Sequence, residues 1–146
     1  MIGSAADNKS SAPFGLMFHH FIGGDKYPSA QGAISSEEFE KIIDRYLSES
    51  RILCAEEWAY KAENNKLRNG EVCVTLDDGL QCQVDVALPV LESKGLTAFW
   101  FVQSGILVGD FGVLEVFRRF RNEYFSSVVD FYRAFYSVTF GSSRLT

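Results

Sequence analysis

Residues 71–79, Glu-Val-Cys-Val-Thr-Leu-Asp-Asp-Gly, decide how the middle of this 146-residue chain folds. The first six are β-branched and alternating, which predicts a strand over Glu71–Leu76 that runs into a turn at Asp77-Asp78-Gly79. The residues that follow have two interpretations. They alternate as the second strand of a hairpin would, and an Asp-Gly turn favours hairpins. They also have the spacing of a helix that ends at Lys94-Gly95.

The next apolar run favours the helix. Residues 97–102, Thr-Ala-Phe-Trp-Phe-Val, predict a strand that is buried on both faces, as in a parallel sheet with helices on each side. Parallel pairing with the strand at 71–76 requires a crossover, and the residues in between have room for one helix, kinked at Pro89. The sequence therefore predicts the order strand, loop, kinked helix, strand.

The N-terminal half continues this alternation. Residues 1–15 are small and polar and predict a flexible N-terminus, after which Leu16–Ile22 predicts a buried strand. A capping box at Ser35 and Glu38 then opens an amphipathic helix. Its apolar face consists of Phe39, Ile42, Ile43, Tyr46 and Leu47. A weaker helix is predicted over residues 55–67, with Trp58, Ala59 and Ala62 facing inward. The fold class is therefore α/β.

The last third, Val113 to Phe140, has helical periodicity throughout. Its apolar residues form two neighbouring stripes, and such a surface is too large for a helix exposed to solvent. We expect it to be covered by the rest of the domain, by self-association with another subunit, or by polypeptide that follows residue 146.

Composition excludes several classes of protein. The net charge of −5 argues against nucleic acid as a partner. Three cysteines without CxxC spacing indicate reduced thiols rather than disulfides or a cysteine zinc site. We find no signal peptide and no apolar run long enough for a membrane span, so a cytoplasmic protein is expected. The spacings of a dinucleotide-binding loop, a P-loop and a Gly-x-Ser-x-Gly elbow are missing from the sequence.

Asp77 and Asp78 are the candidate site residues, because ligands of α/β folds bind at the carboxyl ends of strands. Adjacent carboxylates stay ionised more easily when a cation lies between them, so such a pair can accompany a metal. Asp-Asp-Gly is also a common turn, and that interpretation stays open. His19 and His20 are neighbours on a predicted strand and face opposite sides, so at most one can share a site with Asp78.

Several motifs in order resemble the polysaccharide deacetylase (NodB-homology) family of carbohydrate esterases. They are Val72-Cys-Val-Thr-Leu-Asp-Asp-Gly79, Ala87-Leu-Pro-Val-Leu91, Lys94-Gly-Leu96 and Ala98-Phe-Trp-Phe-Val102. The early Leu16-Met-Phe-His-His20 is similar to a segment that often opens members of the family. The resemblance covers residues 16 to about 105 and is far more specific than Asp-Asp-Gly alone.

The resemblance implies an incomplete, distorted (β/α) barrel over residues 16–146, and metal-dependent hydrolysis of an N-acetyl or O-acetyl group on a carbohydrate. Asp77 would be the general base, and Asp78 would bind a divalent metal such as zinc. The family's second motif supplies two histidine ligands, whereas this chain has no histidine after His20. We therefore expect the N-terminal part of a longer deacetylase, or a degenerate relative, that does not turn over substrate as given.

The alternative prediction is a non-catalytic α/β binding or assembly module. In that case Asp77-Asp78-Gly79 is only a turn, and the aromatic helix that begins at Val113 is the interface with a partner.

Overall fold

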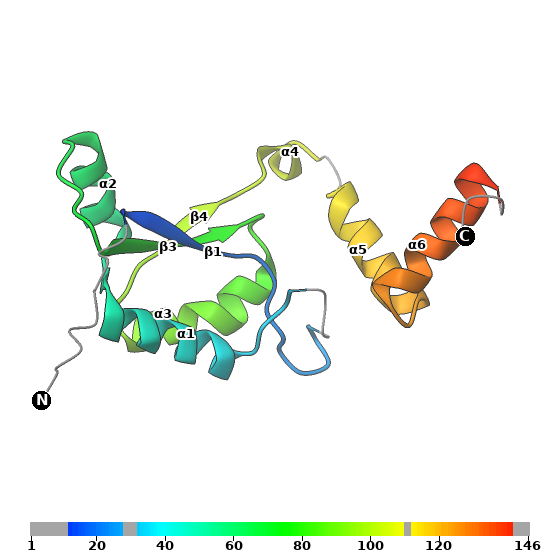
Figure 1. The fold of residues 1–146 in the computed structure, drawn as a ribbon, viewed down its shortest axis with the longest axis horizontal. Coiled ribbons are helices and arrows are strands. Elements are labelled where there is room, and N and C mark those ends of the chain that lie inside the picture. The colour runs from blue at the N-terminus through cyan, green and yellow to red at the C-terminus, as the bar shows by residue number, and fades with distance from the viewer. Residues whose placement is uncertain (1–11, 28–31, 110–111, 142–146) are drawn as a thin grey trace, which may run out of the picture. The chain divides into compact units, whose positions relative to one another are not determined.

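The computed structural model describes residues 12–27, 32–109 and 112–141, which divide into two compact units between Val102 and Gln103. The first unit contains a parallel sheet (Figure 1). Its strands are β1 (Phe14–Phe18), β2 (Arg51–Ile52), β3 (Glu71–Asp77) and β4 (Phe99–Phe101). The helices of this unit are α1 (Ser36–Glu49), α2 (Ala55–Glu63), the π-helical turn η1 (Gln83–Ala87) and α3 (Leu88–Ser93). An α/β fold with a parallel sheet is therefore confirmed, and the incomplete, distorted (β/α) barrel stays a prediction.

β3 is the centre of the sheet. It pairs with β1 along Val72–Leu76, with β2 at its beginning and with β4 at its end, all in parallel. Because the pairings with β2 and β4 each overlap that with β1, β2 and β4 both lie on the edge of β3 opposite to β1. Parallel strands place their carboxyl ends at the same edge of a sheet, so β1, β3 and β4 all end beside one another.

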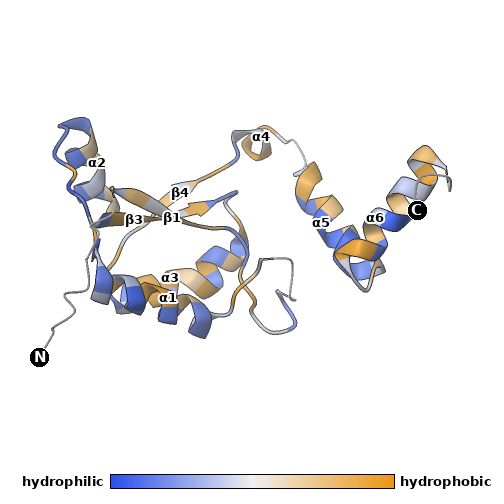
Figure 2. Cartoon of the chain, viewed as in Figure 1, coloured by the Kyte–Doolittle hydropathy of each residue, from blue (hydrophilic) through white to orange (hydrophobic). Residues whose placement is uncertain are grey.

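One face of the sheet is covered by α1 and α3, which lie on the same side of it (Figure 1). Alternate residues of β3 point into this layer, and Val72, Val74 and Leu76 have no exposed surface. Phe39 and Ile43 from α1 pack against them, as the amphipathic pattern predicted. Figure 2 shows the apolar side of both helices turned toward the strands.

The boundaries at the start of the chain differ from those predicted. β1 begins at Phe14 rather than Leu16, because the Phe14 ring packs edge-to-face on Tyr46 of α1, with centroids 6.1 Å apart. Residues 1–11 of the predicted flexible terminus lie outside the described residues. α2 ends at Glu63 instead of residue 67, and Ala62, which was predicted to face inward, is exposed.

The segment after the Asp-Asp-Gly turn is helical, so the hairpin interpretation is wrong. Residues 81–93 form a continuous helical stretch that contains the π-helical turn and then α3. Pro89 lies within this stretch, directly after the π-helical turn, in the first turn of α3. Gly95, with φ +63°, follows the helix as predicted.

The prediction that the strand at 97–102 is buried on both faces is wrong. β4 pairs with three residues of β3, and Trp100, opposite Leu76, packs on the core side of the sheet. Phe99 and Phe101 alternate with it, stack on each other at 6.2 Å, and leave Phe101 56% exposed. In the described residues, the helix layer of α1 and α3 covers the core side of this strand only.

The second unit holds three helices in its described part, α4 (Ser104–Leu107), α5 (Val113–Tyr124) and α6 (Val128–Phe140). The periodicity predicted one helical segment, whereas the helix breaks between Tyr124 and Val128. The break has a local cause, since the Ser127 side chain accepts a hydrogen bond from the Asp130 N–H and caps α6. Among the described residues, no helix is long and apolar enough to cross a membrane.

Candidate functional site

The candidate site lies at the carboxyl end of β3. Asp77 is the last residue of this strand and lies opposite Phe101 of β4, while the preceding Leu76 lies opposite Phe18 at the end of β1. Asp78 and Gly79 follow directly. The two aspartates are therefore located where the sequence predicted, at the edge of the sheet at which ligands of parallel α/β folds bind.

The turn after Asp77 has an unusual backbone. Asp78 has φ +75° and Gly79 has φ +64°, so two successive residues occupy the left-handed region. Aspartate tolerates this region better than most residues, and glycine occupies it without strain. A Cβ at Gly79 would also lie 3.2 Å from a methyl carbon of Val102. The turn is thus both tightly wound and packed against the end of β4.

The two carboxylates are half-buried. The Oδ1 atom of Asp77 is buried, and it has no hydrogen-bond partner within the described part of the structure. Most buried polar atoms in proteins are hydrogen-bonded, so an unpaired carboxylate oxygen at the end of a strand requires an explanation. An oxygen that accepts a proton or a ligand during function would be one.

Gln83, a residue that the sequence analysis did not single out, contacts the same turn. Its side chain is completely buried and donates from Nε2 to the backbone oxygens of Asp77 at 2.5 Å and His19 at 2.9 Å. Its Oε1 accepts from the backbone N–H of Leu80 at 3.2 Å. A glutamine within an otherwise apolar helix face was the only available signal.

His19 and His20 come directly after β1, and both are half-buried. The backbone oxygens of both residues accept hydrogen bonds. That of His20 accepts from the Ile34 N–H at 3.2 Å, and that of His19 accepts from the Gln83 side chain. A catalytic zinc takes three protein ligands. Within residues 12–27, 32–109 and 112–141, no group of three or more His, Cys, Asp or Glu side chains could hold a metal ion. The described residues therefore do not form a complete zinc site.

A second acidic group, Asp85, lies away from the aspartate turn. It accepts hydrogen bonds from Lys26 at 2.5 Å, from the Tyr27 hydroxyl at 2.6 Å and from Gln81 at 2.9 Å. The bond from Lys26, followed by those from Tyr27 and Gln81, holds the pKa of Asp85 well below its usual range. Asp85 borders an open cavity of about 410 Å³ whose lining does not include Asp77 or Asp78.

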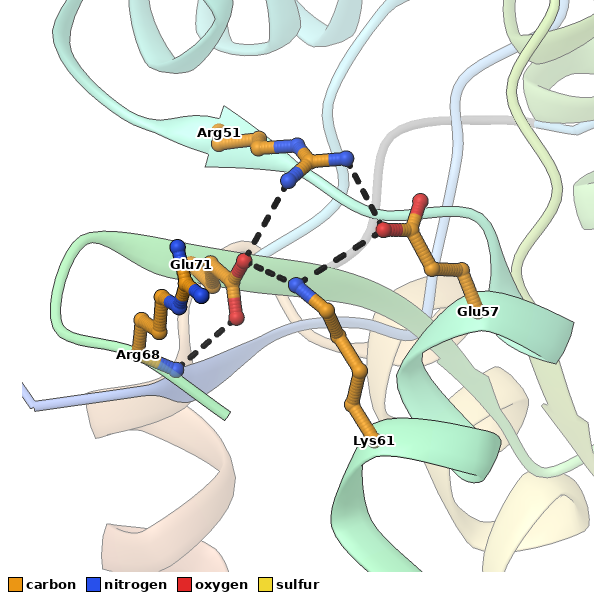
Figure 3. Close-up of polar contacts among 5 residues, drawn as sticks. All are labelled: Arg51, Glu57, Lys61, Arg68 and Glu71. Atoms are coloured by element: carbon orange, nitrogen blue, oxygen red, sulfur yellow. Dashed lines mark hydrogen bonds and ion pairs between the residues drawn. The ribbon is translucent and has the colours of Figure 1, made fainter. Parts of the chain in front are cut away.

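The amino end of β3 carries an ion-pair cluster instead of a ligand-facing turn (Figure 3). The buried carboxylate of Glu71 pairs with Lys61 of α2, and its Oε2 accepts from the Arg68 backbone N–H at 2.8 Å. Arg51 forms ion pairs with both carboxylates, with Glu57 at 2.8 Å and with Glu71 at 3.5 Å. The hydrogen bond from Lys61 lowers the pKa of Glu71 despite its burial. The two ends of β3 therefore differ, one with paired charges and one with an unpaired carboxylate oxygen.

Two of the three cysteines, Cys73 and Cys82, are buried, and Cys54 is half-buried. Burial raises the pKa of the Cys73 thiol, which keeps it protonated and unreactive.

No protein-family model matches the chain, and no curated protein matches it. Among solved structures, the chain is similar to IcaB from Ammonifex degensii, with 30% sequence identity and a TM-score of 0.53. The similarity covers 65% of this chain and 40% of that one, so it extends over less than half of IcaB. This likeness supports, at most, a deacetylase-like α/β fold.

Proposed function

We propose that this chain carries part of the active site of a carbohydrate deacetylase, a hydrolase that removes an N-acetyl or O-acetyl group from a sugar. The main supporting observation is Asp77-Asp78-Gly79 at the carboxyl end of the central parallel strand. The likeness to IcaB, a polysaccharide deacetylase, supports the same assignment at the level of the fold.

In this proposal the two aspartates have different roles. Asp77 accepts a proton from the water that attacks the acetyl carbonyl, a role that suits a carboxylate with a buried, unpaired oxygen. Asp78 contributes one ligand to a divalent metal, which we propose to be zinc. When bound, such a metal lowers the pKa of water and polarises the carbonyl. The described residues do not complete that site, so further donors are required for turnover.

The proposal is tested by titrating the ¹⁵N-labelled chain with Zn²⁺ and following its backbone amide signals. Weak binding by an incomplete site is expected to shift the signals of residues 77–80, and Asp78→Asn is expected to abolish these shifts. Glu92→Gln is the matched control, because it removes an exposed carboxylate from α3. If zinc leaves the signals of residues 77–80 unchanged, or if Asp78→Asn responds like the unmodified chain, the metal-ligand role is wrong.

The base role of Asp77 requires a separate measurement in a protein that supplies the remaining ligands. Fusing residues 1–102 to the complementary part of IcaB is expected to give a chain that releases acetate from an N-acetylated hexosamine oligomer. Asp77→Asn should reduce kcat by at least about 100-fold, the usual contribution of a general base. An active fusion that is unaffected by Asp77→Asn would contradict the assignment.

A second candidate function, that of a binding or assembly module, is favoured by one observation. Large apolar side chains of α5 and α6 are exposed, among them Phe117, Tyr124 and Val138. Exposed apolar surface of this kind often marks an interaction site. In this proposal the partner is a second copy of the chain or another polypeptide.

A further inference from the structure

Gln83 is a completely buried polar residue beside the candidate site. Burying an amide without hydrogen bonds costs several kcal/mol, roughly 2–7 depending on the reference state. Each half of this amide is satisfied: Nε2, which carries two N–H groups, donates to two backbone oxygens, and Oε1 accepts from one backbone N–H. The side chain thus matches the polar groups around it in both number and kind.

The partners of Gln83 show what it connects. The last register pair of β1 and β3 is Phe18 with Leu76, and the two oxygens that Gln83 binds belong to the next residue of each strand, His19 and Asp77. Gln83 therefore joins the two strands one residue beyond the end of their register. It does so with a side chain that comes from a third element, η1.

The same side chain also spans the aspartate turn. It binds the Asp77 oxygen before the turn and the Leu80 N–H after it, so Asp78 and Gly79 lie between two points held by one residue. The backbone N–H of Gln83 donates to the Leu80 oxygen at 3.0 Å and closes the connection. A turn with two successive positive φ values is held in place by such contacts.

The helix around Gln83 is irregular in a related way. The N–H of Leu88 donates to the Gln83 oxygen, the i to i+5 pattern of a π-helical turn. Such turns insert one residue into a helix and are frequent at functional sites. Here the π-helical turn begins at Gln83, the residue whose side chain bonds to the ends of both strands.

From these contacts we infer that Gln83 is a positioning residue, which fixes the aspartate turn relative to the end of β1. This inference rests on the proposed function, because the proposed roles of Asp77 and Asp78 are what make the position of the turn important. Gln83 acts through the backbone on both sides of Asp78 and does not contact substrate itself. Its side chain bonds to backbone atoms of His19, Asp77 and Leu80 rather than to a carboxylate.

The first test uses the unmodified chain and compares two glutamines. Gln81 is exposed and donates to Asp85, whereas Gln83 is buried and donates to two backbone oxygens. The side-chain NH₂ protons of Gln83 are expected to exchange with solvent at least about 10-fold more slowly than those of Gln81. Equal exchange rates would overturn the inference without any variant having to fold.

The second test compares Gln83→Met with Gln81→Met. Met has a similar length but lacks both the carbonyl oxygen that accepts from the Leu80 N–H and the N–H groups that donate to His19 and Asp77. Gln83→Met should therefore accelerate amide exchange of Leu80 by at least about 10-fold relative to Val74 of β3. It should also shift the amide signals of residues 78–80. Gln81→Met should change neither. If Gln83→Met accelerates Leu80 and Val74 equally, Gln83 stabilises the whole unit and does not position the turn.

A third variant identifies which hydrogen bonds matter. Gln83→Glu keeps the acceptor for Leu80 but replaces the donors to His19 and Asp77 with an oxygen. If the bridge between strands positions the turn, Glu should shift the amide signals of residues 78–80 as Met does. If it leaves them unchanged, the bridge has no positioning role.

The role of Gln83 and the proposed metal binding can fail independently of each other. If the unmodified chain shows no Zn²⁺-dependent shifts at residues 77–80, the metal proposal fails while the exchange results still decide the role of Gln83. If zinc does bind, Gln83→Met should raise its dissociation constant about 10–100-fold, the usual effect of losing a residue that orients a ligand. An unchanged constant would contradict positioning of Asp78.

Discussion

Glu71 is the most deeply buried carboxylate of the described chain, and its partners determine what its charge does. Replacing it with Gln keeps the size and one acceptor but leaves the Lys61 ammonium without its main anionic partner (Figure 3). We expect Glu71→Gln to lower the free energy of unfolding by about 1–3 kcal/mol, measured by urea denaturation. Glu63→Gln, an exposed carboxylate on α2, should change it by less than about 0.5 kcal/mol. Equal effects would show that the pairing contributes nothing specific.

The same residue predicts a pH dependence. Its pKa in the folded chain is lowered from 4.5, chiefly by the hydrogen bond from Lys61. A carboxylate with a lowered folded pKa contributes stability above its unfolded pKa, and this contribution is lost as the pH falls through the folded value. The difference in unfolding free energy between the unmodified chain and Glu71→Gln should therefore be full at neutral pH and shrink below about pH 4.5. A difference independent of pH would contradict this.

Some of the polar residues in and around β3 could be found from the sequence, and others could not. Asp77 and Asp78 were found because an Asp-Asp-Gly turn directly follows a β-branched run, so their position depends on local sequence alone. Gln83 was missed because its partner His19 is 64 residues away, and a helical pattern does not indicate which polar residue bridges two strands. The pairing of Glu71 with Lys61 was also missed, because the patterns of a helix and of a strand do not indicate which of their polar residues meet, even 10 residues apart.

At the scale of elements, α1 depends on its first turn. The Ser35 side chain accepts from the Glu38 N–H at 3.2 Å, and the Glu38 carboxylate accepts from the Ser35 N–H at 2.8 Å. Ser35→Ala removes the first bond and should reduce the unfolding free energy by about 1 kcal/mol in chemical denaturation. Ser48→Ala, in the last turns of the same helix, serves as the control and should be nearly neutral. A loss of similar size in both variants would argue against a specific capping effect.

The elements that could be predicted are those with a local signal at each end. The capping box placed the start of α1, and Lys94-Gly95 correctly indicated the end of the helix that follows the turn. The break between α5 and α6 has a local signal on one side only, the Ser127 cap at the start of α6, and Phe125 continues the aromatic stripe across the break. Its ring packs edge-to-face on Phe120 at 5.8 Å and on Phe131 at 5.3 Å. Tertiary packing of an apolar residue at the break therefore hid the end of the helix.

β4 illustrates a different limit. A continuous apolar run normally indicates burial on both faces, but it does not specify which segment covers the second face. In the described residues α1 and α3 cover the side on which Trp100 packs, and Phe101 on the other side is largely exposed. Periodicity correctly predicted the strand and its parallel pairing, and its prediction of burial was wrong on that side.

At the scale of the molecule, the two units differ in how much they bury. Every residue of the core cluster, with the partly buried residues packed against it, lies between Phe14 and Trp100, within the first unit. The described parts of α4, α5 and α6 contain no buried residue, and Val138 is 87% exposed. Because hydrophobic burial is the dominant favourable term in folding, the stability of the first unit should come from residues that precede Gln103.

This distribution predicts the effect of ending the chain at Val102. Residues 1–102 should unfold cooperatively in urea, with a midpoint close to that of the full chain, because the truncation removes none of the core. The truncated chain should also bind less of an apolar dye and show less concentration-dependent light scattering, since the exposed apolar residues of α5 and α6 are gone. Phe117→Ser with Val138→Ser in the full chain is the matched control, and it should lower dye binding and scattering while leaving the midpoint unchanged. A truncated chain without a cooperative transition would show that residues 103–146 are required to fold the sheet, and the exposed side chains of α5 and α6 would then have to be assigned to its stabilisation rather than to a partner.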